Sequence, residues 1–326
     1  MIVVTGAAGF IGSNVIAALN SLGRIDIAAV DNPEMFGLTG NLADLSTNVR
    51  VEKDDLNVWL LKYSRSIECV IHMGACSDTT QSDREFMMHN NFEYSQRLWE
   101  FCSTHGKRYV YASSAATYGD GSKGYDDNAD PARLEPLNLY GESKQRFDLW
   151  ALAQQEKPRG WAGLKFFNVY GNRERHKGRM ASVAYHSFEQ IRATGKVRLF
   201  KSDRPDFPNG GQMRDFVYVK DVVAAILHFA FATESNIEGL FNVGTGEART
   251  FADLARAVFS ALSRQPNIEF FDMPADLKGK YQYFTQATVV KLRAAGFTNP
   301  FHSLESGVKD YHNPNYPPAA PPSIMS

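Results

Sequence analysis

Short apolar runs of strand length alternate with longer helical patterns through the first 170 residues of the chain. The strand-like runs are 2–5, 25–30, 68–73, 107–112 and 163–167. The helical patterns between them include 10–22, 84–104 and 140–155. Apolar strands that alternate with helices predict right-handed βαβ units, so we expect an α/β fold with a doubly wound parallel sheet.

Beyond Tyr170 the order of elements becomes less regular. The pattern predicts helices near 180–194, 222–231 and 251–263 and a strand-like segment at 215–219. We therefore expect residues 1–170 to form the first domain and residues 171–312 to form mainly a smaller C-terminal α/β substrate lobe. Segments near 214–246 can return to the first domain. The last 14 residues, 313–326, include five prolines and predict a disordered tail.

Composition and charge narrow the classes of function. The 326-residue chain has 35 basic and 36 acidic side chains and a formal net charge of −1, which argues against nucleic-acid binding through the phosphate backbone. No apolar run approaches the roughly 18 residues of a membrane span, and no signal peptide is recognisable. The three cysteines form no CxxC pair, and the eight histidines show no metal-ligand spacing. We expect a cytoplasmic protein with no nucleic-acid, membrane or metal partner.

A glycine-rich turn follows the first strand and opens the first helix. Its three glycines are Gly6, Gly9 and Gly12, in a GxxGxxG spacing that varies the dinucleotide fingerprint. Glycine lets the turn tighten and the backbone approach a pyrophosphate, and the helix start offers N–H groups to the phosphates. The motif predicts a Rossmann-type, NAD(P)-binding first domain.

The residue that ends the second strand bears on the choice of cofactor. Asp31 lies 19 residues after Gly12, close to the spacing of about 20 expected for an acid that binds the ribose hydroxyls. Its charge favours NAD, whereas Asn32 and Lys53 can face the 2′-phosphate of NADP. Physical reasoning alone leaves both cofactors open.

A candidate catalytic group lies on the helix at 140–155. Tyr140 and Lys144 form a YxxxK motif, so the phenol and the ammonium share one helix face. Ser114 leaves the end of a predicted strand, where ligands gather in such sheets. Tyr140 can take a proton from a hydroxyl that Ser114 orients. A tyrosine with a pKa of about 10 needs a shift of about 3 units to do so near pH 7, which Lys144 and a positive nicotinamide ring together can supply.

Several motifs together resemble the extended short-chain dehydrogenase/reductase superfamily, whose members act on nucleotide sugars. Besides the glycine turn, Ser114, Tyr140 and Lys144, they are 168–171 (NVYG), 214–219 (RDFVYV) and 242–246 (NVGTG). A narrower set resembles the ADP-L-glycero-D-manno-heptose 6-epimerase family, bacterial enzymes that supply heptose for lipopolysaccharide. These segments are 72–77 (HMGACS), 87–91 (MMHNN), 113–119 (SSAATYG), 176–184 (HKGRMASVA) and 277–282 (LKGKYQ). The likeness extends to about Tyr311.

The resemblance implies a reaction and a set of site residues. The family oxidises C6 of the heptose with tightly bound NADP and returns the hydride to the opposite face of the ketone. It implies that Lys177 is a second proton handler beside Tyr140, and that the protein is a homo-oligomer, a pentamer. The implied cofactor contacts are Phe10, Ile11, Asp31, Asn32, Lys53, Met73, Gly74, Ala75, Cys76, Ser77, Asn90, Lys144, Val169 and Lys177. The implied contacts to the nucleotide-diphosphate sugar (ADP-heptose) are Ser114, Asn168, Arg179, His186, Phe200, Lys201, Ser202, Asp203, Arg214 and Tyr281.

The chain departs from the family pattern at three places. Leu38 stands where members tend to carry a lysine, which weakens NADP relative to NAD. Arg179 replaces a small residue, and the proline-rich loop 203–211 is longer than usual and lies beside the substrate segment. The nearest alternative function is another nucleotide-sugar epimerase, such as a UDP-hexose 4-epimerase. A non-catalytic NAD(P)-sensing scaffold is a further alternative, but it has no need of the catalytic group.

Overall fold

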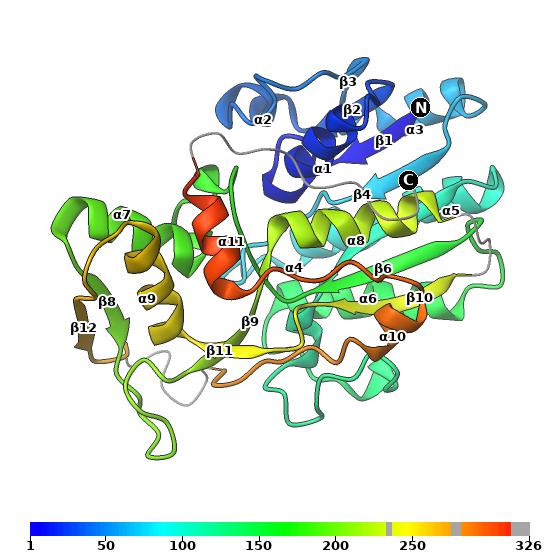
Figure 1. Cartoon of the computed structure of the whole chain (residues 1–326). Helices are drawn as coiled ribbons and strands as arrows, with labels where there is room; N and C mark the ends of the chain where they lie inside the picture. The colour runs from blue at the N-terminus through cyan, green and yellow to red at the C-terminus, as the bar shows by residue number, and fades with distance from the viewer. Residues whose placement is uncertain (233–236, 275–281, 314–326) are drawn as a thin grey trace.

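The computed structural model describes residues 1–232, 237–274 and 282–313. Within these residues the largest element is a seven-stranded sheet in the order β10-β6-β5-β4-β1-β2-β3 (Figure 1). Every neighbouring pair in it is parallel. Its strands are β1 (Ile2–Thr5), β2 (Ile27–Asp31), β3 (Val49–Glu52), β4 (Cys69–His72), β5 (Arg108–Ser114), β6 (Trp161–Phe166) and β10 (Glu238–Val243). The predicted α/β class with a doubly wound parallel sheet is confirmed.

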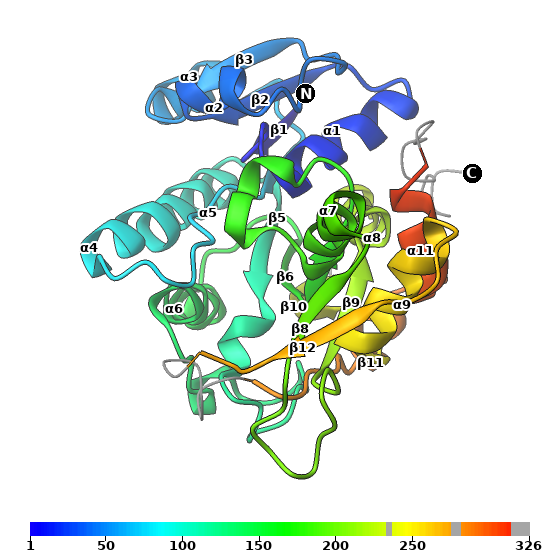
Figure 2. The same ribbon diagram turned by 90° about the vertical axis from the view of Figure 1, so that its left-hand side faces the viewer.

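Helices cover both faces of this sheet (Figure 2). On one face lie α1 (Phe10–Ser21) and α8 (Val219–Phe231), and on the other lie α3 (Leu56–Tyr63), α5 (Tyr94–Thr104) and α6 (Leu139–Ala153). Successive strand residues face opposite sides, so Ile2 and Val4 belong to the core under α1, whereas Val3 belongs to the core under α5. Each face of the sheet therefore has its own apolar core.

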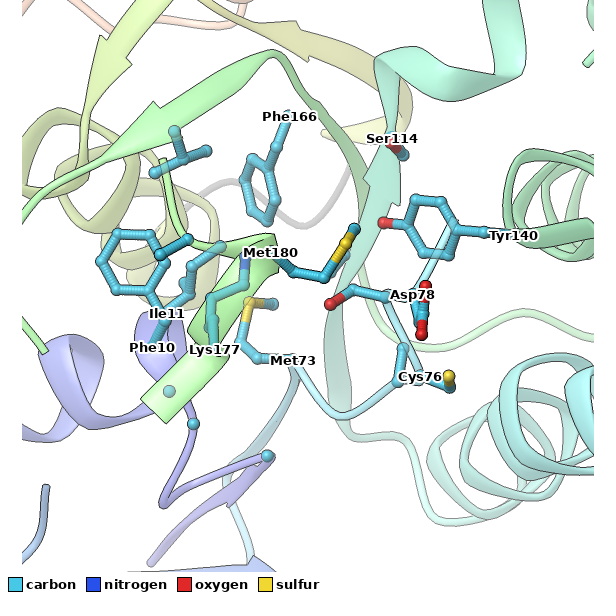
Figure 3. Close-up of a pocket in the computed structure, with 18 of the residues that line it drawn as sticks. Phe10, Ile11, Met73, Cys76, Asp78, Ser114, Tyr140, Phe166, Lys177 and Met180 are labelled. Atoms are coloured by element: carbon cyan, nitrogen blue, oxygen red, sulfur yellow. The ribbon is translucent and has the colours of Figure 1, made fainter. Parts of the chain in front are cut away.

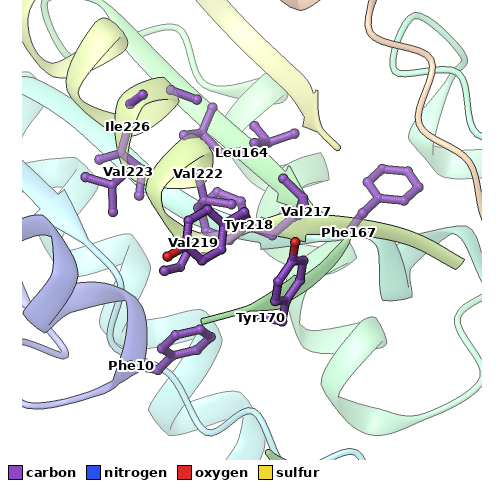
Figure 4. Packing of buried hydrophobic residues seen from close by; sticks show 14 of the residues in the cluster. Phe10, Leu164, Phe167, Tyr170, Val217, Tyr218, Val219, Val222, Val223 and Ile226 are labelled. Atoms are coloured by element: carbon purple, nitrogen blue, oxygen red, sulfur yellow. The ribbon is translucent and has the colours of Figure 1, made fainter. Parts of the chain in front are cut away.

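Helix α8 packs beside α1 against β4, β5 and β6 and also contacts β7 and β9, so that nearly all of its residues are buried (Figure 4). Val219, Val222 and Val223 pack in the same cluster as Leu164 of β6 and Val217, which precedes the helix. A helix that is hydrophobic all round is typical of a buried position. The helix thus joins the two parts of the molecule through a shared core.

A second set of elements packs beside the carboxyl ends of the sheet. It contains a three-stranded sheet in the order β11-β9-β7 and the pair β8 and β12. Helix α9 contacts both α7 and α11. The bounds are β7 (Asn168–Tyr170), α7 (Val183–Thr194), β8 (Val197–Phe200), β9 (Met213–Tyr218), β11 (Ala248–Thr250), α9 (Phe251–Ala261), β12 (Ile268–Phe271) and α11 (Leu304–Tyr311). Helix α10 (Val290–Ala294) packs instead against β10 of the large sheet. Strand β10, although late in the sequence, pairs with β6 in the large sheet.

Two helices differ from the sequence prediction in informative ways. The helix predicted at 84–104 contains α4 (Arg84–Met87), a π-helical segment (Met88–Glu93) and α5. The helix predicted from 180 begins at Val183, because the Ser182 side chain caps it by accepting from the Tyr185 N–H at 3.1 Å. The remaining short elements are α2 (Pro33–Leu38) and the 3₁₀ turns η2 (Ala115–Tyr118), η3 (Pro131–Arg133) and η4 (Arg175–Met180).

Candidate active site

A cavity of about 970 Å³ opens at the carboxyl ends of the parallel strands. Residues that follow β1, β2, β4 and β5 line one side, and the segment 176–184 lines the other (Figure 3). Ligands of doubly wound sheets bind at this edge, because the helix starts and strand ends converge there. The topology alone therefore places this cavity where a nucleotide is expected.

The glycine turn forms the floor of the cavity at the start of α1. Gly6 has a φ of +63°, and a Cβ added to it would lie 2.7 Å from the backbone nitrogen of Gly74. A Cβ on Gly12 would lie 2.1 Å from the carbonyl oxygen of Gly6. No side chain caps α1, so its first N–H groups remain available to a ligand. The turn fits the pyrophosphate of a dinucleotide.

Asp31 is fixed beside this turn by the backbone. Its two carboxylate oxygens accept hydrogen bonds from the N–H groups of Ala8 and Asn32, each at 2.9 Å. Burial raises the pKa of Asp31, while these hydrogen bonds and the charge of Lys53 oppose the rise. Lys53 in turn donates a hydrogen bond to the side chain of Asn90. An acid and a base thus lie together where the ribose end of a dinucleotide is expected.

Ser114 and Tyr140 meet because α6 starts very close to the turn after β5. A Cβ on Gly141 would lie 2.7 Å from the carbonyl oxygen of Ala116, so only glycine permits this approach. The Asn138 side chain caps the helix by accepting from the Gly141 N–H at 2.9 Å. Burial raises the pKa of Tyr140, and its hydrogen bond with Ser114 partly offsets the rise.

Lys144 lies one helical turn after Tyr140 and is buried. Burial lowers the pKa of Lys144 to about 8, against the opposing attraction of Asp148 and of Cys76. Both Lys144 and Cys76 line the cavity. Burial therefore disfavours the charged form of Lys144, and ionisable groups with a pKa perturbed in this way are typical of functional sites.

Lys177 reaches the cavity from the opposite side (Figure 3). Its Nζ lies 5.6 Å from the centre of the Phe10 ring, at the start of α1. Burial lowers the pKa of Lys177, and the charge of the buried Glu174 opposes the change. In the close-up, Met180 lies between Lys177 and Tyr140. Two groups that can exchange protons thus face one space from opposite sides of the cavity.

The segment that carries Lys177 is tied to the glycine turn. Arg173 adopts a φ of +74°, which is unusual for a residue with a side chain, and its guanidinium pairs with both carboxylate oxygens of Asp44 at 3.0 and 2.6 Å. Asn41 donates to the carbonyl oxygens of Ala8 at 3.1 Å and of Arg173 at 2.9 Å. The position of Lys177 is therefore coupled to the turn on which the cofactor is expected.

The cavity brings together all of the catalytic and cofactor residues that the sequence predicted. The lining includes Gly6, Gly9, Phe10, Ile11, Gly12, Asp31, Asn32, Lys53, Met73, Gly74, Ala75, Cys76, Ser77, Asn90, Ser114, Tyr140, Lys144, Val169 and Lys177. Asn168 and Arg214, predicted as substrate contacts, also line it. The roles of these residues remain predictions.

Other predicted substrate contacts lie away from the lining. Arg179 donates to the Thr80 hydroxyl at 2.6 Å and lies 3.6 Å from the Asp78 carboxylate. His186 lies on α7, with Nε2 3.4 Å from the carbonyl oxygen of Arg179. Phe200 is the last residue of β8, and Lys201, Ser202 and Asp203 follow it, where Ser202 and Asp203 contact the hydroxyl of Tyr283. Tyr281 lies outside the described residues.

Sequence reasoning missed several residues of the lining. They include Asp78, Phe86, Tyr94, His176, Met180 and Phe251. His176 and Met180 belong to the 176–184 motif, so their place in that run was the available signal. Phe251 begins α9 of the second lobe, and no local pattern in the sequence connects it to the glycine turn.

In residues 1–232, 237–274 and 282–313, no three His, Cys, Asp or Glu side chains lie close enough together to hold a metal ion. Over the same described residues, no helix combines the length and the apolar character needed to cross a membrane.

Comparison with known proteins gives consistent matches. A family model described as the NAD dependent epimerase/dehydratase family matches residues 2–244. The ADP-L-glycero-D-manno-heptose-6-epimerase of Fusobacterium nucleatum is 48% identical over 322 residues, covering 95% of this chain and 96% of that protein. The solved ADP-L-glycero-D-manno-heptose-6-epimerase of Helicobacter pylori aligns with a TM-score of 0.79 and 28% identity, covering 95% of this chain and 94% of that one. The UDP-glucose 4-epimerase of Thermotoga maritima, solved with UDP-glucose, aligns with a TM-score of 0.78 and 26% identity, covering 97% of each chain.

Proposed function

Because the chain belongs to the NAD dependent epimerase/dehydratase family and, within it, to the ADP-L-glycero-D-manno-heptose 6-epimerases, we propose that it inverts C6 of the heptose in ADP-D-glycero-D-manno-heptose. The product is ADP-L-glycero-D-manno-heptose, so the protein is an isomerase that acts on a nucleotide sugar with a nicotinamide cofactor. One observation carries the proposal: Tyr140 with Ser114, and Lys177 from the other side, face a single cavity (Figure 3).

The chain's own residues supply the proton chemistry. A bound nicotinamide supplies the acceptance and return of a hydride. Tyr140 takes the proton of the C6 hydroxyl, which Ser114 orients through its own hydroxyl. The positive charge of Lys144 favours the phenolate of Tyr140. Inversion requires hydride return to the other face of the carbon, so Lys177 acts as the second proton handler.

Incubation with ADP-D-glycero-D-manno-heptose, with no added cofactor, tests the reaction. We expect conversion to the C6 epimer, measured by NMR or chromatography, because the hydride is returned in each cycle. No conversion, together with rapid turnover of UDP-glucose, would contradict the assignment and favour the UDP-hexose 4-epimerase alternative.

Substitution of the two proton handlers tests their roles. We expect Tyr140→Phe and Lys177→Met each to abolish epimerisation while the nucleotide stays bound, because each removes a proton-exchanging group from the cavity and leaves the glycine turn intact. Near-normal turnover by Lys177→Met would show that another group serves the second face.

We propose NADP as the resident cofactor, with NAD as the alternative. The two oxygens of Asp31 already accept backbone hydrogen bonds, and Lys53 places a positive charge beside them. Asn32 immediately precedes α2, and its side chain makes no capping hydrogen bond to that helix, so its amide can reach a phosphate. The mass of the nucleotide released on denaturing the purified protein decides between the two cofactors.

The resemblance also leads us to propose a homo-oligomer, a pentamer. Sedimentation equilibrium of the purified protein measures the assembly mass directly. A monomeric mass at concentrations that give full activity would overturn this part of the proposal.

A further inference from the structure

A buried ion pair lies directly beneath the candidate catalytic group. Lys165, next to the carboxyl end of β6, and Asp148, on α6, are both almost completely inaccessible to solvent, and the Lys165 Nζ lies 3.0 Å from Asp148 Oδ2. Neither residue lines the cavity. Replacing such a pair by apolar residues is often neutral or stabilising, so stability alone is a weak explanation for its presence.

The hydrogen bonds of the pair enclose the segment that carries Ser114. Asp148 accepts from the Ser113 hydroxyl at 2.7 Å, immediately before Ser114. Lys165 donates to the Thr117 hydroxyl at 2.7 Å, and that hydroxyl donates to the carbonyl oxygen of Ser114 at 2.8 Å. Ser114 is thus held from both sides through one ion pair.

The same carboxylate lies on the helix of Tyr140 and Lys144. Asp148 occupies the position one turn after Lys144, and its negative charge favours the protonated forms of both Tyr140 and Lys144. Lys165, whose Nζ lies 3.0 Å from Asp148 Oδ2, opposes that effect with its positive charge. The net field at the phenol therefore depends on both members of the pair.

We propose that Asp148 and Lys165 are positioning residues, which hold Ser114 against Tyr140 and set the charge balance under the Tyr140–Lys144 pair. The proposal rests on the proposed epimerase function, since it assigns Tyr140 as the proton acceptor. It adds a role for two residues that touch neither substrate nor cofactor and that act through the residues that do.

Several other ionisable groups face Asp148, Lys165, Tyr140 or Lys144. Asp148 is also faced by Tyr111 of β5, whose hydroxyl donates to it at 2.9 Å, and by Tyr118 of η2. Cys76 faces both Tyr140 and Lys144 from the loop after β4, and His72 of β4 faces Lys144. Lys291 faces Lys165 from α10. The test therefore changes only Asp148 and Lys165 and keeps all of these groups.

The test compares the pH dependence of Asp148→Asn, Lys165→Met and the double variant with that of the wild type. The first readout is the acid limb of the epimerisation rate. The second needs no substrate: the phenolate absorbance of each holoenzyme is titrated against the same protein with Tyr140→Phe. Arg146→Met is the matched control, because Arg146 also pairs on α6, with Glu142 at 2.8 Å, but at the exposed surface.

We expect the two single variants to shift the Tyr140 titration in opposite directions. Asp148→Asn removes the negative charge, so the titration moves to lower pH by about one unit, a tenfold rise in phenolate at fixed pH. Lys165→Met leaves Asp148 uncompensated, so the titration moves to higher pH. The double variant lies between them, and Arg146→Met matches the wild type. A merely structural role would lower stability without opposite shifts.

Shifts in the same direction, or no shift in either single variant, would overturn the proposal. If Lys165→Met does not fold, Asp148→Asn and the double variant still decide, because Asp148→Asn must shift to lower pH and the double variant must titrate at a higher pH than Asp148→Asn. If the wild type shows no epimerisation while the phenolate titrations shift as expected, the proposed function fails and the electrostatic role of the pair stands.

Discussion

The burial of Lys144 predicts that removing this residue stabilises the protein. The pKa of Lys144 is lowered from its ordinary value of 10.5 to about 8, chiefly by burial. Each unit corresponds to 1.36 kcal/mol, so keeping the ammonium charged in the folded state costs about 3 kcal/mol at pH 7. We expect Lys144→Met, of similar length and without a charge, to recover most of this free energy and to abolish epimerisation.

The pH dependence distinguishes this explanation from a general packing effect. Between pH 8 and 10.5 the unfolded chain binds the lysine proton and the folded wild type does not, so wild-type stability rises with pH in this window. Below pH 8 both states are protonated and the cost is constant. The advantage of Lys144→Met is therefore greatest at or below pH 7 and disappears as the pH approaches 10.5.

Urea unfolding of both proteins at pH 6 to 10.5, after removal of bound nucleotide, measures the difference. Both proteins are compared in the Tyr140→Phe background, because the charge of Lys144 affects the titration of Tyr140. The other tyrosines are common to both proteins, so their titration cancels in the comparison. A variant that is less stable than the wild type at pH 7, or a difference that does not change with pH, would refute the reasoning.

Three further predictions concern the glycine turn, the His302–Asp221 contact and the apolar core. Gly12→Ala would place its Cβ 2.1 Å from the Gly6 carbonyl oxygen, so we expect loss of bound nucleotide, checked by absorbance of the purified protein, and destabilisation by about 1–3 kcal/mol. The hydrogen bond with the Asp221 carboxylate raises the pKa of His302, so the stabilisation from this contact is complete below pH 6.5 and is lost as the pH rises through the folded-state pKa. The loss of thermal stability in His302→Gln, relative to the wild type, should therefore be larger at pH 6 than at pH 9. Trp99→Ala should cost about 3–5 kcal/mol in urea unfolding, because Trp99 is fully buried among Tyr109, Phe147 and Trp161; a loss below 1 kcal/mol would contradict the packing.

The parts of the fold set by local patterns could be predicted from the sequence. The glycine turn was recognisable because its strand, its three glycines and the acid Asp31 occur within one short segment. The structure shows why the glycines are needed, since Gly6 and Gly12 leave no room for a Cβ. The YxxxK spacing was equally local, because a single helix sets the relation of Tyr140 to Lys144.

The apolar spacing of an ordinary α-helix did not predict the π-helical turn, which holds one more residue per hydrogen-bonded turn than an α-helix. The π-helical segment Met88–Glu93 interrupts the helix predicted at 84–104. This segment brings Asn91 to Cys76. The Asn91 side chain accepts a hydrogen bond from the Cys76 N–H at 2.9 Å and donates one to the Cys76 carbonyl oxygen at 3.0 Å. The segment also brings Asn90 to Lys53. The sequence motif 87–91 marked the place but not the geometry.

Contacts between distant segments account for most of the remaining differences. Arg179, which the resemblance implies as a substrate contact, pairs with Thr80 and Asp78, which lie about 100 residues earlier in the chain, and its role toward the substrate stays a prediction. Charge alone does not select between a ligand and a nearby carboxylate. Which partner an arginine takes depends on how distant segments pack against each other, and sequence order does not reveal this packing. Strands β9 and β10, for example, are neighbours in the sequence, but β9 belongs to the three-stranded sheet and β10 to the seven-stranded sheet.

One signal in the sequence did point to a hidden site. Lys165 lies inside the apolar run 163–167, which is predicted to be a strand of the doubly wound sheet, and strands of such parallel sheets are generally buried on both faces. A lysine in such a strand needs a buried acceptor, because an unpaired ammonium in an apolar interior would lose its proton. Asp148 was the acidic residue on the predicted helix 140–155 that lies one turn beyond Lys144. A charged residue inside an apolar run is therefore a better guide to the electrostatics of this site than the near-zero net charge, in which the charges of Lys165 and Asp148 cancel.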